Sequence, residues 1–596
     1  MTAAVPSSLR AWRTRLMHGV PALPVLVFLA VTYFVPLALL LSRSVVSPSG
    51  QWTLEHFIRL FETSAYVSSL LLTLKMSLST AALSVAIGYP LAFVIARAGK
   101  SLALSLVMGV LAAYWAGVLV RTFAWLVVLG RNGPINSGLA WLGITERPLE
   151  FLYHYGGVMM GMVNAWTPLA VLVMVATMQT IDQRLIRAAS TLGAGGGQAF
   201  WRIFFPLSMP GLVSAFLLVF MGCLGTFVVP ALLGSGRDVM VAQVMIVQVE
   251  QLLNWGFAGA IGVLILLATL LVLAVFAKVF GMDALLGRAA AGRSVNHSGF
   301  ARVLGRNLLG LLGSMSDAVA SLADTARSRL RRQQGRHSPV LLAAAVIVLA
   351  FLLTPTLFLV PMSIGSGAFI EWPPKGFSLR WYELVLGSGA WVRAGVHSIY
   401  VAVLAAAFSV ALTLPAAIAL TRRKIVGQKL IMAAMVAPMI IPHILLAVAL
   451  FLVFAPLGLV GTDLGLVTGH TLVCVPYTFV TLMAILSGYD QRLDQAACTL
   501  GARSWQRLWH VTLPLIRTGL LAAFLIAFIT SFEELTIALF VTGGLSATLP
   551  KQLWSEMILA ASPALAAVST LMLVFVLTIV AVVHMLKRRS PIAAGR

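Results

Sequence analysis

The feature that most constrains this chain is a series of apolar segments, each long enough to cross a membrane as a helix. A bilayer core about 30 Å thick needs about 20 consecutive apolar residues. We predict helices at approximately 21–42, 67–96, 102–129, 153–180, 207–233, 256–280, 340–362, 396–421, 428–456, 464–487, 515–541 and 564–586. Charged residues make up only 10% of the chain, whereas a soluble domain carries about 25%. The sequence therefore predicts an all-α polytopic membrane protein with about twelve transmembrane helices.

The distribution of basic residues orients these predicted helices. The net charge of +23 would suggest nucleic-acid binding in a soluble chain. Here Arg and Lys instead cluster in alternate short loops, for example at 97–100 and 422–429, and such clusters stay on the cytoplasmic side. Arg10, Arg13 and Arg15 precede the first apolar run, which is longer than the core of a signal peptide. We therefore predict two cytoplasmic termini and no nucleic-acid partner.

A basic stretch divides the chain in two. Residues 282–338 contain nine Arg and three Asp, as expected for a cytoplasmic linker lying near anionic lipid. On this basis the first half spans 1–281, with a core at about 67–280. The second half spans 339–596, with a core at about 396–586.

The second half repeats the first. Residues 182–207 and 490–515 share 14 of 26 positions without a gap, at an offset of 308. Nearer the start of each half, the segment from Ser84 to Arg97 pairs with that from Ser409 to Arg422 at an offset of 325. Such self-similarity indicates an internal duplication. Because each half has six predicted helices, an even number, the two halves are expected to be parallel repeats.

The most similar segments lie in the predicted cytoplasmic loop between the fourth and fifth helices of each half. Two small Ala residues allow a short helix to approach a partner closely. A Gly can then end this helix, and a Pro can begin the next one. The residues are Arg187-Ala188-Ala189, Gly193 and Pro206 in the first half, and Gln495-Ala496-Ala497, Gly501 and Pro514 in the second. The pattern predicts a short helix in each loop, with small residues that would let a partner approach and a glycine that ends the helix.

These loops resemble the EAA loop of type I ABC importer permeases, which have the MetI-like fold. The resemblance implies that the chain is the membrane-spanning component of an ATP-driven importer, with both halves fused. The residues that it assigns to ATPase coupling are Arg184, Ala188, Ala189, Gly193, Pro206, Arg492, Ala496, Ala497, Gly501 and Pro514. Arg187 and Gln495 stand where the family pattern has an acidic residue, so Arg184 and Arg492, with Asp182 and Asp490, are alternative polar contacts.

The resemblance also implies the partners. The chain has no GxxxxGK[ST] phosphate loop, so a separate cytoplasmic ABC ATPase homodimer is expected to hydrolyse ATP with Mg²⁺. A periplasmic binding protein is expected to deliver the solute. The chain itself is then a transport subunit of the bacterial inner membrane, not an enzyme, and we expect it to hold no cofactor or metal ion.

Further segments resemble the polyamine (spermidine/putrescine) permeases. They are Val120–Trp125, Leu129–Asn136, Ser531–Leu535 and Thr542–Pro550. This resemblance implies a small polycation as the solute. Related fused permeases for 2-aminoethylphosphonate, ferric iron or thiamine remain alternatives, as do an ion-coupled secondary transporter and a non-transporting scaffold or receptor.

Polar residues within the predicted helices are candidates for the solute path. Glu533 and Glu534 fall inside the predicted eleventh helix, where an ionisable group usually faces a cavity or a partner. Carboxylates suit a polycation, although a structural pair with Arg121 is an alternative. Arg121 is itself a path candidate, but a cation there would repel a polyamine, so pairing with a carboxylate or contact with the binding protein are its alternatives. Asn164 and Trp166 lie near a proline in the fourth helix, and an aromatic ring can pack on a cation. Interhelical packing is the alternative for both.

Overall fold

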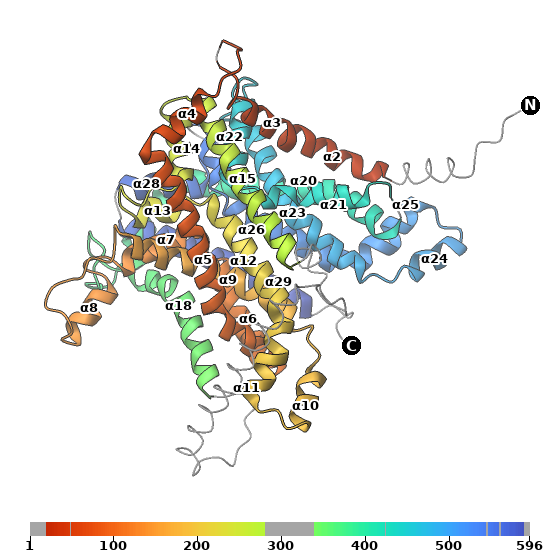
Figure 1. The fold of residues 1–596 in the computed structure, drawn as a ribbon, viewed down its shortest axis with the longest axis horizontal. Helices are drawn as coiled ribbons and strands as arrows, with labels where there is room; N and C mark the ends of the chain where they lie inside the picture. The colour runs from red at the N-terminus through yellow and green to blue at the C-terminus, as the bar shows by residue number, and fades with distance from the viewer. Residues whose placement is uncertain are drawn as a thin grey trace, which may run out of the picture.

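The structure is a computed structural model built of α-helices, and it describes residues 19–47, 49–280, 339–423, 425–543, 546–559 and 562–588. Within these ranges, β-structure is limited to two isolated bridges. Figure 1 shows long helices packed into one bundle, with the short helices at 134–141, 183–191 and 492–499 at its periphery. The predicted linker at 282–338 lies outside the described residues.

The helices of the first half begin near the N-terminus and end before the linker. In order they are η1 (Val20–Ala22), α2 (Leu23–Leu29), η2 (Ala30–Phe34), α3 (Val35–Ser42), α4 (Glu55–Glu62), α5 (Ser64–Arg97), α6 (Lys100–Tyr114), α7 (Val118–Val128), α8 (Pro134–Trp141), α9 (Tyr155–Met178), α10 (Gln183–Thr191), α11 (Gly196–Ala199), η3 (Phe200–Phe204), α12 (Phe205–Leu224), α13 (Val228–Leu233), α14 (Val241–Glu250) and α15 (Trp255–Phe280).

The second half follows the same plan. Its helices are α18 (Pro339–Ser363), α19 (Arg380–Gly387), α20 (Gly389–Arg422), α21 (Gln428–Ile440), α22 (His443–Phe454), α23 (Asp463–Ser487), α24 (Arg492–Thr499), α25 (Ser504–Arg507), η4 (Leu508–Thr512), α26 (Leu513–Phe532), α27 (Thr536–Val541), α28 (Leu549–Leu559) and α29 (Pro563–Arg588).

The duplication is visible element by element. At an offset of 325, the bounds of α4 and α5 coincide with those of α19 and α20. At an offset of 308, the bounds of α12, α13 and α15 coincide with those of α26, α27 and α29. The short helix α8 lies in the loop at 130–152, where the two offsets change, and the second half has no equivalent of it. The prediction of an internal duplication is confirmed.

The two halves interlock through their first helices. Helices α5, α9 and α12 form the centre of the first half, and α20, α23 and α26 form the centre of the second. Helix α18 of the second half packs against α5, α6 and α7 of the first, while α2 and α3 of the first half pack against α20, α21 and α22 of the second. Each half therefore covers part of the other. Such close packing is what drives helices to associate in lipid.

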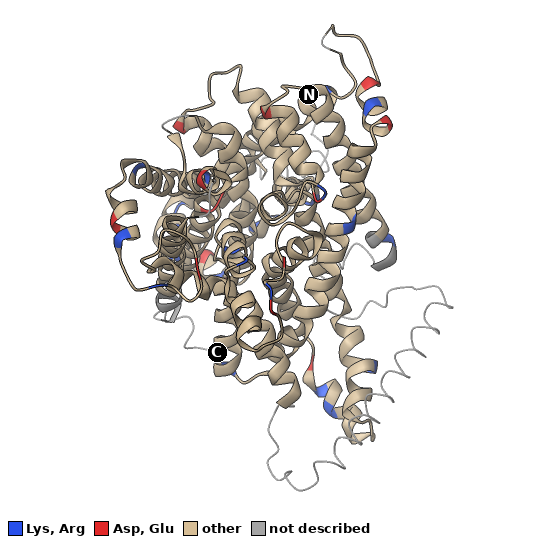
Figure 2. Ribbon diagram, turned by 90° about the vertical axis from the view of Figure 1, so that its left-hand side faces the viewer, with Lys and Arg blue, Asp and Glu red and all other residues tan. Residues whose placement is uncertain are grey.

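The number of membrane-spanning helices agrees with the prediction. In the part of the chain that the structure describes, ten helices are long and apolar enough to cross a membrane, and two bent pairs bring the number to twelve. Figure 2 shows that the long helices carry few charges along their lengths, and that most charged residues lie near helix ends and in loops. The all-α polytopic fold is thus confirmed.

Two predicted helices are broken rather than continuous. The segment at 102–129 bends by 88° between α6 and α7, and the segment at 428–456 bends by 97° between α21 and α22. At the first break, Gly117 has a φ of +64°, which a residue with a Cβ atom rarely adopts. At the second break, Pro442 occupies the equivalent position and lacks a backbone N–H to continue the helix.

The predicted helices at 207–233 and 515–541 also need correction at both ends. They begin earlier, because α11 and α25 run into the π-helical turns η3 and η4, giving continuous spans at Gly196–Leu224 and Ser504–Phe532. In these π turns a backbone N–H donates to the carbonyl five residues earlier, instead of four as in an α-helix. The helical hydrogen-bond register therefore shifts by one residue just before Pro206 and Pro514. The spans also end earlier, at Leu224 and Phe532, and continue as α13 and α27 after a short break.

Candidate functional site

Four helix breaks meet in the centre of the bundle, and each meeting joins one half to the other. The break between α6 and α7 lies against that between α26 and α27, where a Cβ atom on Gly117 would be 3.5 Å from the carboxyl carbon of Glu533. The break between α12 and α13 lies against that between α21 and α22, where a Cβ atom on Gly225 would be 2.6 Å from Cβ of Pro442. At Gly225 only glycine permits this approach, whereas at Gly117 the contact would be an ordinary one and the φ of +64° is what favours glycine.

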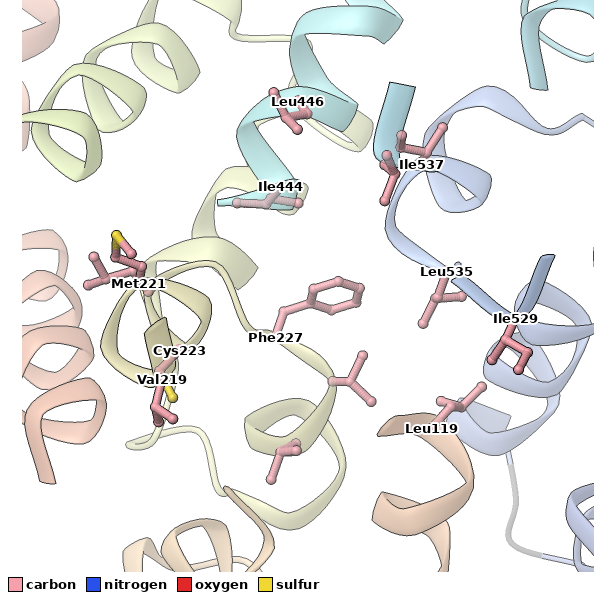
Figure 3. Packing of buried hydrophobic residues seen from close by; sticks show 14 of the residues in the cluster. Leu119, Val219, Met221, Cys223, Phe227, Ile444, Leu446, Ile529, Leu535 and Ile537 are labelled. Atoms are coloured by element: carbon pink, nitrogen blue, oxygen red, sulfur yellow. The ribbon is translucent and has the colours of Figure 1, made fainter. Parts of the chain in front are cut away.

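Apolar side chains at the four breaks belong to one buried hydrophobic cluster, and we give the name constriction to four of them, Leu119, Phe227, Ile444 and Leu535. All four are at most 7% exposed. Figure 3 shows Phe227 extending toward Leu535, with Leu119 and Ile444 on either side in that view. Leu119 and Ile444 are equivalent at the offset of 325, and Phe227 and Leu535 at the offset of 308. The constriction is therefore built from two symmetry-related pairs, one member of each pair from each half.

The prediction that Glu533 and Glu534 lie within a helix is wrong. Both residues lie in the break between α26 and α27. Helix α26 ends at Phe532, and α27 begins at Thr536. Glu533 is half-buried, and its carboxyl group lies against Gly117 of the other half. It also interacts electrostatically with Arg121 and Tyr114. This places an acidic group beside the constriction.

Glu534 has a different environment. Its carboxylate accepts hydrogen bonds from the backbone N–H groups of Ile537, at 2.9 and 3.0 Å, and of Ala538, at 3.1 Å. The side chain is 6% exposed, and His470 lies 3.7 Å away. These are the bonds of a residue that caps the first turn of a helix. Glu534 therefore holds the start of α27.

The other path candidates have packing partners. Arg121 is 3% exposed and donates from Nη1 to the Ala165 carbonyl at 2.8 Å, which ties α7 to α9. Asn164 is fully buried and donates to the Phe351 carbonyl of α18 at 2.8 Å. Both placements favour the packing interpretation. Trp166 is half-buried, and its ring covers Gly222 of α12 so closely that no Cβ atom would fit there.

The two docking loops, which we define as 182–206 and 490–514, have the same backbone design. Gly193 and Gly501 have φ angles of +84° and +86°. The backbone N–H of Ala194 donates to Ala189, and that of Ala502 donates to Ala497, each at 3.0 Å. These bonds close a helix end of the Schellman type. The expectation that a glycine ends each docking helix is confirmed.

The remaining polar residues of these loops have distinct placements. Asp182 and Asp490 accept from the N–H groups of Arg184 and Arg492, so they cap the loops rather than reach outward. Both aspartates are exposed, and so are Arg184, Arg187, Ala188, Arg492, Gln495 and Ala496. Ala189 is buried and Ala497 half-buried. Pro206 and Pro514 lie in the first turns of α12 and α26. Figure 1 shows α10 and α24 on separate arms, at the bottom and the right of the view.

Sequence reasoning missed two features of the docking loops. Leu192 and Leu500, at equivalent positions, are 88% and 87% exposed. Both leucines stand in the shared sequence Thr-Leu-Gly-Ala, which was a signal that could have indicated their equivalent placement. The second feature is Asp494, a buried acidic residue in α24 that pairs with Arg422.

Within the described ranges, no group of three or more His, Cys, Asp or Glu residues is placed to hold a metal ion.

This geometry defines a class of membrane protein with two duplicated, interlocked halves, whose helix breaks meet between the halves. The chain belongs to the family of binding-protein-dependent transport system inner membrane components, whose profile matches residues 88–283 and 409–590. The resemblance to type I ABC importer permeases is thereby confirmed, with two family domains fused in one multi-pass inner-membrane protein.

Known relatives include single-half permeases. The spermidine/putrescine transport system permease protein PotC of Escherichia coli K12 is 30% identical over 242 residues, covering 40% of this chain and 91% of PotC. PotB of the same organism is 29% identical over 225 residues, covering 38% of this chain and 82% of PotB. Among solved structures, a chain of a bacterial alginate ABC importer is 17% identical, with a TM-score of 0.32, covering 50% of this chain and 99% of that one.

Proposed function

We propose that this chain forms the translocation pathway of an ABC importer for a polyamine such as spermidine or putrescine. A periplasmic binding protein delivers the solute, and a cytoplasmic ATPase homodimer supplies the energy from ATP and Mg²⁺. The observation that carries the choice of solute is the half-buried carboxylate of Glu533 beside the constriction. The names of the relatives PotB and PotC support the same solute class.

The chemistry of the site suits an alkyl-amine. A protonated amine that enters an apolar constriction loses water, which is costly unless an opposite charge replaces it. Glu533 supplies that charge at the break between α26 and α27. The half-buried rings of Tyr114, close to Glu533, and of Trp166, in α9, can pack against alkyl segments and attract the cationic ends. An importer of the same class for 2-aminoethylphosphonate, ferric iron or thiamine is the alternative.

The docking loops link this site to the motor. In our proposal, the end of the bundle that carries α10 and α24 faces the cytoplasm together with both termini. Leu192 and Leu500 then insert into matching surfaces of the two ATPase subunits. Closure of the ATPase dimer moves the docking loops, and the connected helices α12 and α26 carry this motion to the breaks that bear Phe227 and Leu535. The constriction opens and closes in alternation on its two sides.

The two adjacent glutamates allow a matched test. Spermidine uptake is measured in proteoliposomes that contain the permease and ATPase, with binding protein added outside. Glu533→Gln should lower the maximal rate of uptake about tenfold or more, as expected when a charge-assisted contact worth about 1.5–3 kcal/mol is lost. Glu533→Asp should retain part of the rate, because it keeps the charge.

Glu534→Gln is the control for a nearby change in charge. It should alter thermal stability more than the rate of uptake per folded molecule, because Glu534 caps α27. Unchanged uptake by Glu533→Gln would remove Glu533 from the path. Stimulation of ATP hydrolysis by another solute, but not by spermidine or putrescine, would replace the polyamine with that solute.

A further inference from the structure

The two docking helices are attached to the bundle in different ways. In the second half, the attachment is a polar network, which we call the Arg422 network and define as Arg422, Tyr489, Asp494 and Thr512. The Arg422 Nη2 atom lies 2.7 Å from Asp494 Oδ2. The side chain of Arg422 is 23% exposed and that of Asp494 is 9% exposed, so the ion pair is largely shielded from water and is screened less than a surface pair.

Each member of this network contacts more than one other member. Thr512 donates to Asp494 Oδ1 at 3.1 Å and accepts from Arg422 at 3.0 Å. Tyr489 donates to Asp494 Oδ1 at 3.1 Å, and its ring lies under the Arg422 guanidinium at 5.4 Å. Burial and the Asp494 charge raise the pKa of the Tyr489 phenol, so it remains a donor.

The network connects three elements. Arg422 is the last residue of α20, Asp494 lies in the docking helix α24, and Thr512 ends the π turn η4 before α26. A second bond reinforces the first connection, since Gln491 donates to the Thr421 carbonyl at 3.4 Å. The docking helix is thereby fixed to two of the three central helices of its half through directional, charge-assisted bonds.

The first half has no such network among its equivalent residues. At the corresponding positions stand Arg97, Ile181, Ile186 and Phe204. There Arg97 is exposed and lies over the ring of Phe93 at 5.1 Å.

The residues around Arg97 form an aromatic cluster of Phe93, Phe200 and Phe204, with ring centroids 4.9 to 6.2 Å apart. Aromatic packing is a contact of surfaces and depends less on direction than an ion pair does.

We propose that the Arg422 network is a positioning device that makes α24 move as one body with α20 and α26, while α10 is held less rigidly, so that the ATPase drives the two halves unequally. This inference rests on the proposed ATP-driven function, because unequal attachment matters only if a motor pushes on both loops. Asp494 and Arg422 are positioning residues and do not contact the solute.

The test begins with a measurement that needs no solute. Among the cysteines, Cys498 in α24 is exposed, while Cys223 and Cys474 are buried, so a spin label on the native protein reports on α24. In the complex with its ATPase, Asp494→Asn should make this label distinctly more mobile. For the first half, a label on Ser190→Cys in a Cys498→Ser background occupies the equivalent site on α10, and Arg97→Gln should leave its mobility unchanged.

The second measurement is the ratio of spermidine imported to ATP hydrolysed in proteoliposomes. Asp494→Asn should lower this ratio about five- to tenfold, which falls within the wider range that coupling energies between paired residues imply, while Arg97→Gln should not lower it. Exchanging the charges, with Arg422→Asp and Asp494→Arg together, should restore part of the ratio. If Asp494→Asn fails to assemble with the ATPase, the variant with exchanged charges still tests whether the ion pair supports coupling.

The inference is overturned if Asp494→Asn leaves the label on Cys498 as immobile as before, or if Arg97→Gln loosens α10 to the same degree. Failure of the proposed solute would look different. Spermidine would then fail to stimulate the wild-type complex itself, while the label on Cys498 would still report whether the network holds α24.

Discussion

Removing the carboxylate of Glu534 should destabilise the protein by an amount that its hydrogen bonds determine. In Glu534→Ala, the N–H groups of Ile537 and Ala538 lose their side-chain acceptor inside the bundle. Each unsatisfied buried donor costs about 1–3 kcal/mol, so two cost about 2–6 kcal/mol. Removing a buried carboxylate also removes its desolvation penalty, which offsets part of that cost. We expect a net loss of about 2–4 kcal/mol.

Two further variants separate the cap from the charge. Glu534→Gln keeps one acceptor oxygen and should cost about 1 kcal/mol, the usual cost of weakening a helix cap. Glu533→Ala removes the neighbouring carboxylate, which makes no hydrogen bond to α27 in the described structure. It should therefore change the stability by less than either variant of Glu534.

The free energy of unfolding can be measured in detergent micelles by titration with SDS, followed by circular dichroism. The expected order of stability is wild type and Glu533→Ala, then Glu534→Gln, then Glu534→Ala. If Glu534→Ala unfolds at the same SDS fraction as wild type, the carboxylate does not cap α27. If Glu533→Ala is the least stable of the three, the roles that we assign to the two glutamates are reversed.

Other perturbations test the docking loops and the constriction. Gly193→Leu and Gly501→Leu would each place a residue with a side chain in a left-handed backbone conformation, which costs about 1–2 kcal/mol. Each substitution should uncouple ATP hydrolysis from uptake. Transport at the wild-type rate by both variants would contradict the docking assignment. Leu500→Asp should weaken co-purification of the ATPase, and undiminished binding would show that this side chain is not in the interface. Leu119→Ala with Ile444→Ala should widen the constriction and raise passive leakage of small solutes from proteoliposomes, whereas tight vesicles would show that the seal lies elsewhere.

Hydropathy and duplication sufficed to predict the membrane spans because both leave strong patterns in the sequence. The ends of the short helices in the docking loops were also predictable, because glycine at a helix end has a specific conformational cause, which Gly193 and Gly501 show. The breaks were not predicted, because the residues on both sides of them are as apolar as the helices themselves. Only Gly117 and Pro442 mark the places where α6 and α21 end, and Gly and Pro also occur within unbroken helices such as α5 and α9.

The roles of individual polar residues depended on distant parts of the chain. Glu533 and Glu534 are adjacent and of the same type, and they differ only because the chain leaves its helix at Phe532 and forms a new one at Thr536. Asp494 could not be recognised because its partner, Arg422, comes from another helix. Asn164 appeared as a path candidate because its true neighbour, Phe351, belongs to the first helix of the other half.

The two duplicated halves differ in the placement of two buried or half-buried acidic residues. Glu533 has Gly225 as its equivalent, and Asp494 has Ile186, so both acidic residues belong to the second half. A second carboxylate at Gly225 would add another charge to an apolar constriction, and each ionised group in such surroundings is costly. It would also hold a polycation more tightly, and passage requires binding weak enough to allow release. In the proposed polyamine pathway, a single carboxylate beside two symmetric pairs of apolar side chains would attract the cationic solute without trapping it. Fusion of the halves in one chain ensures that every assembled pathway contains one copy of that carboxylate.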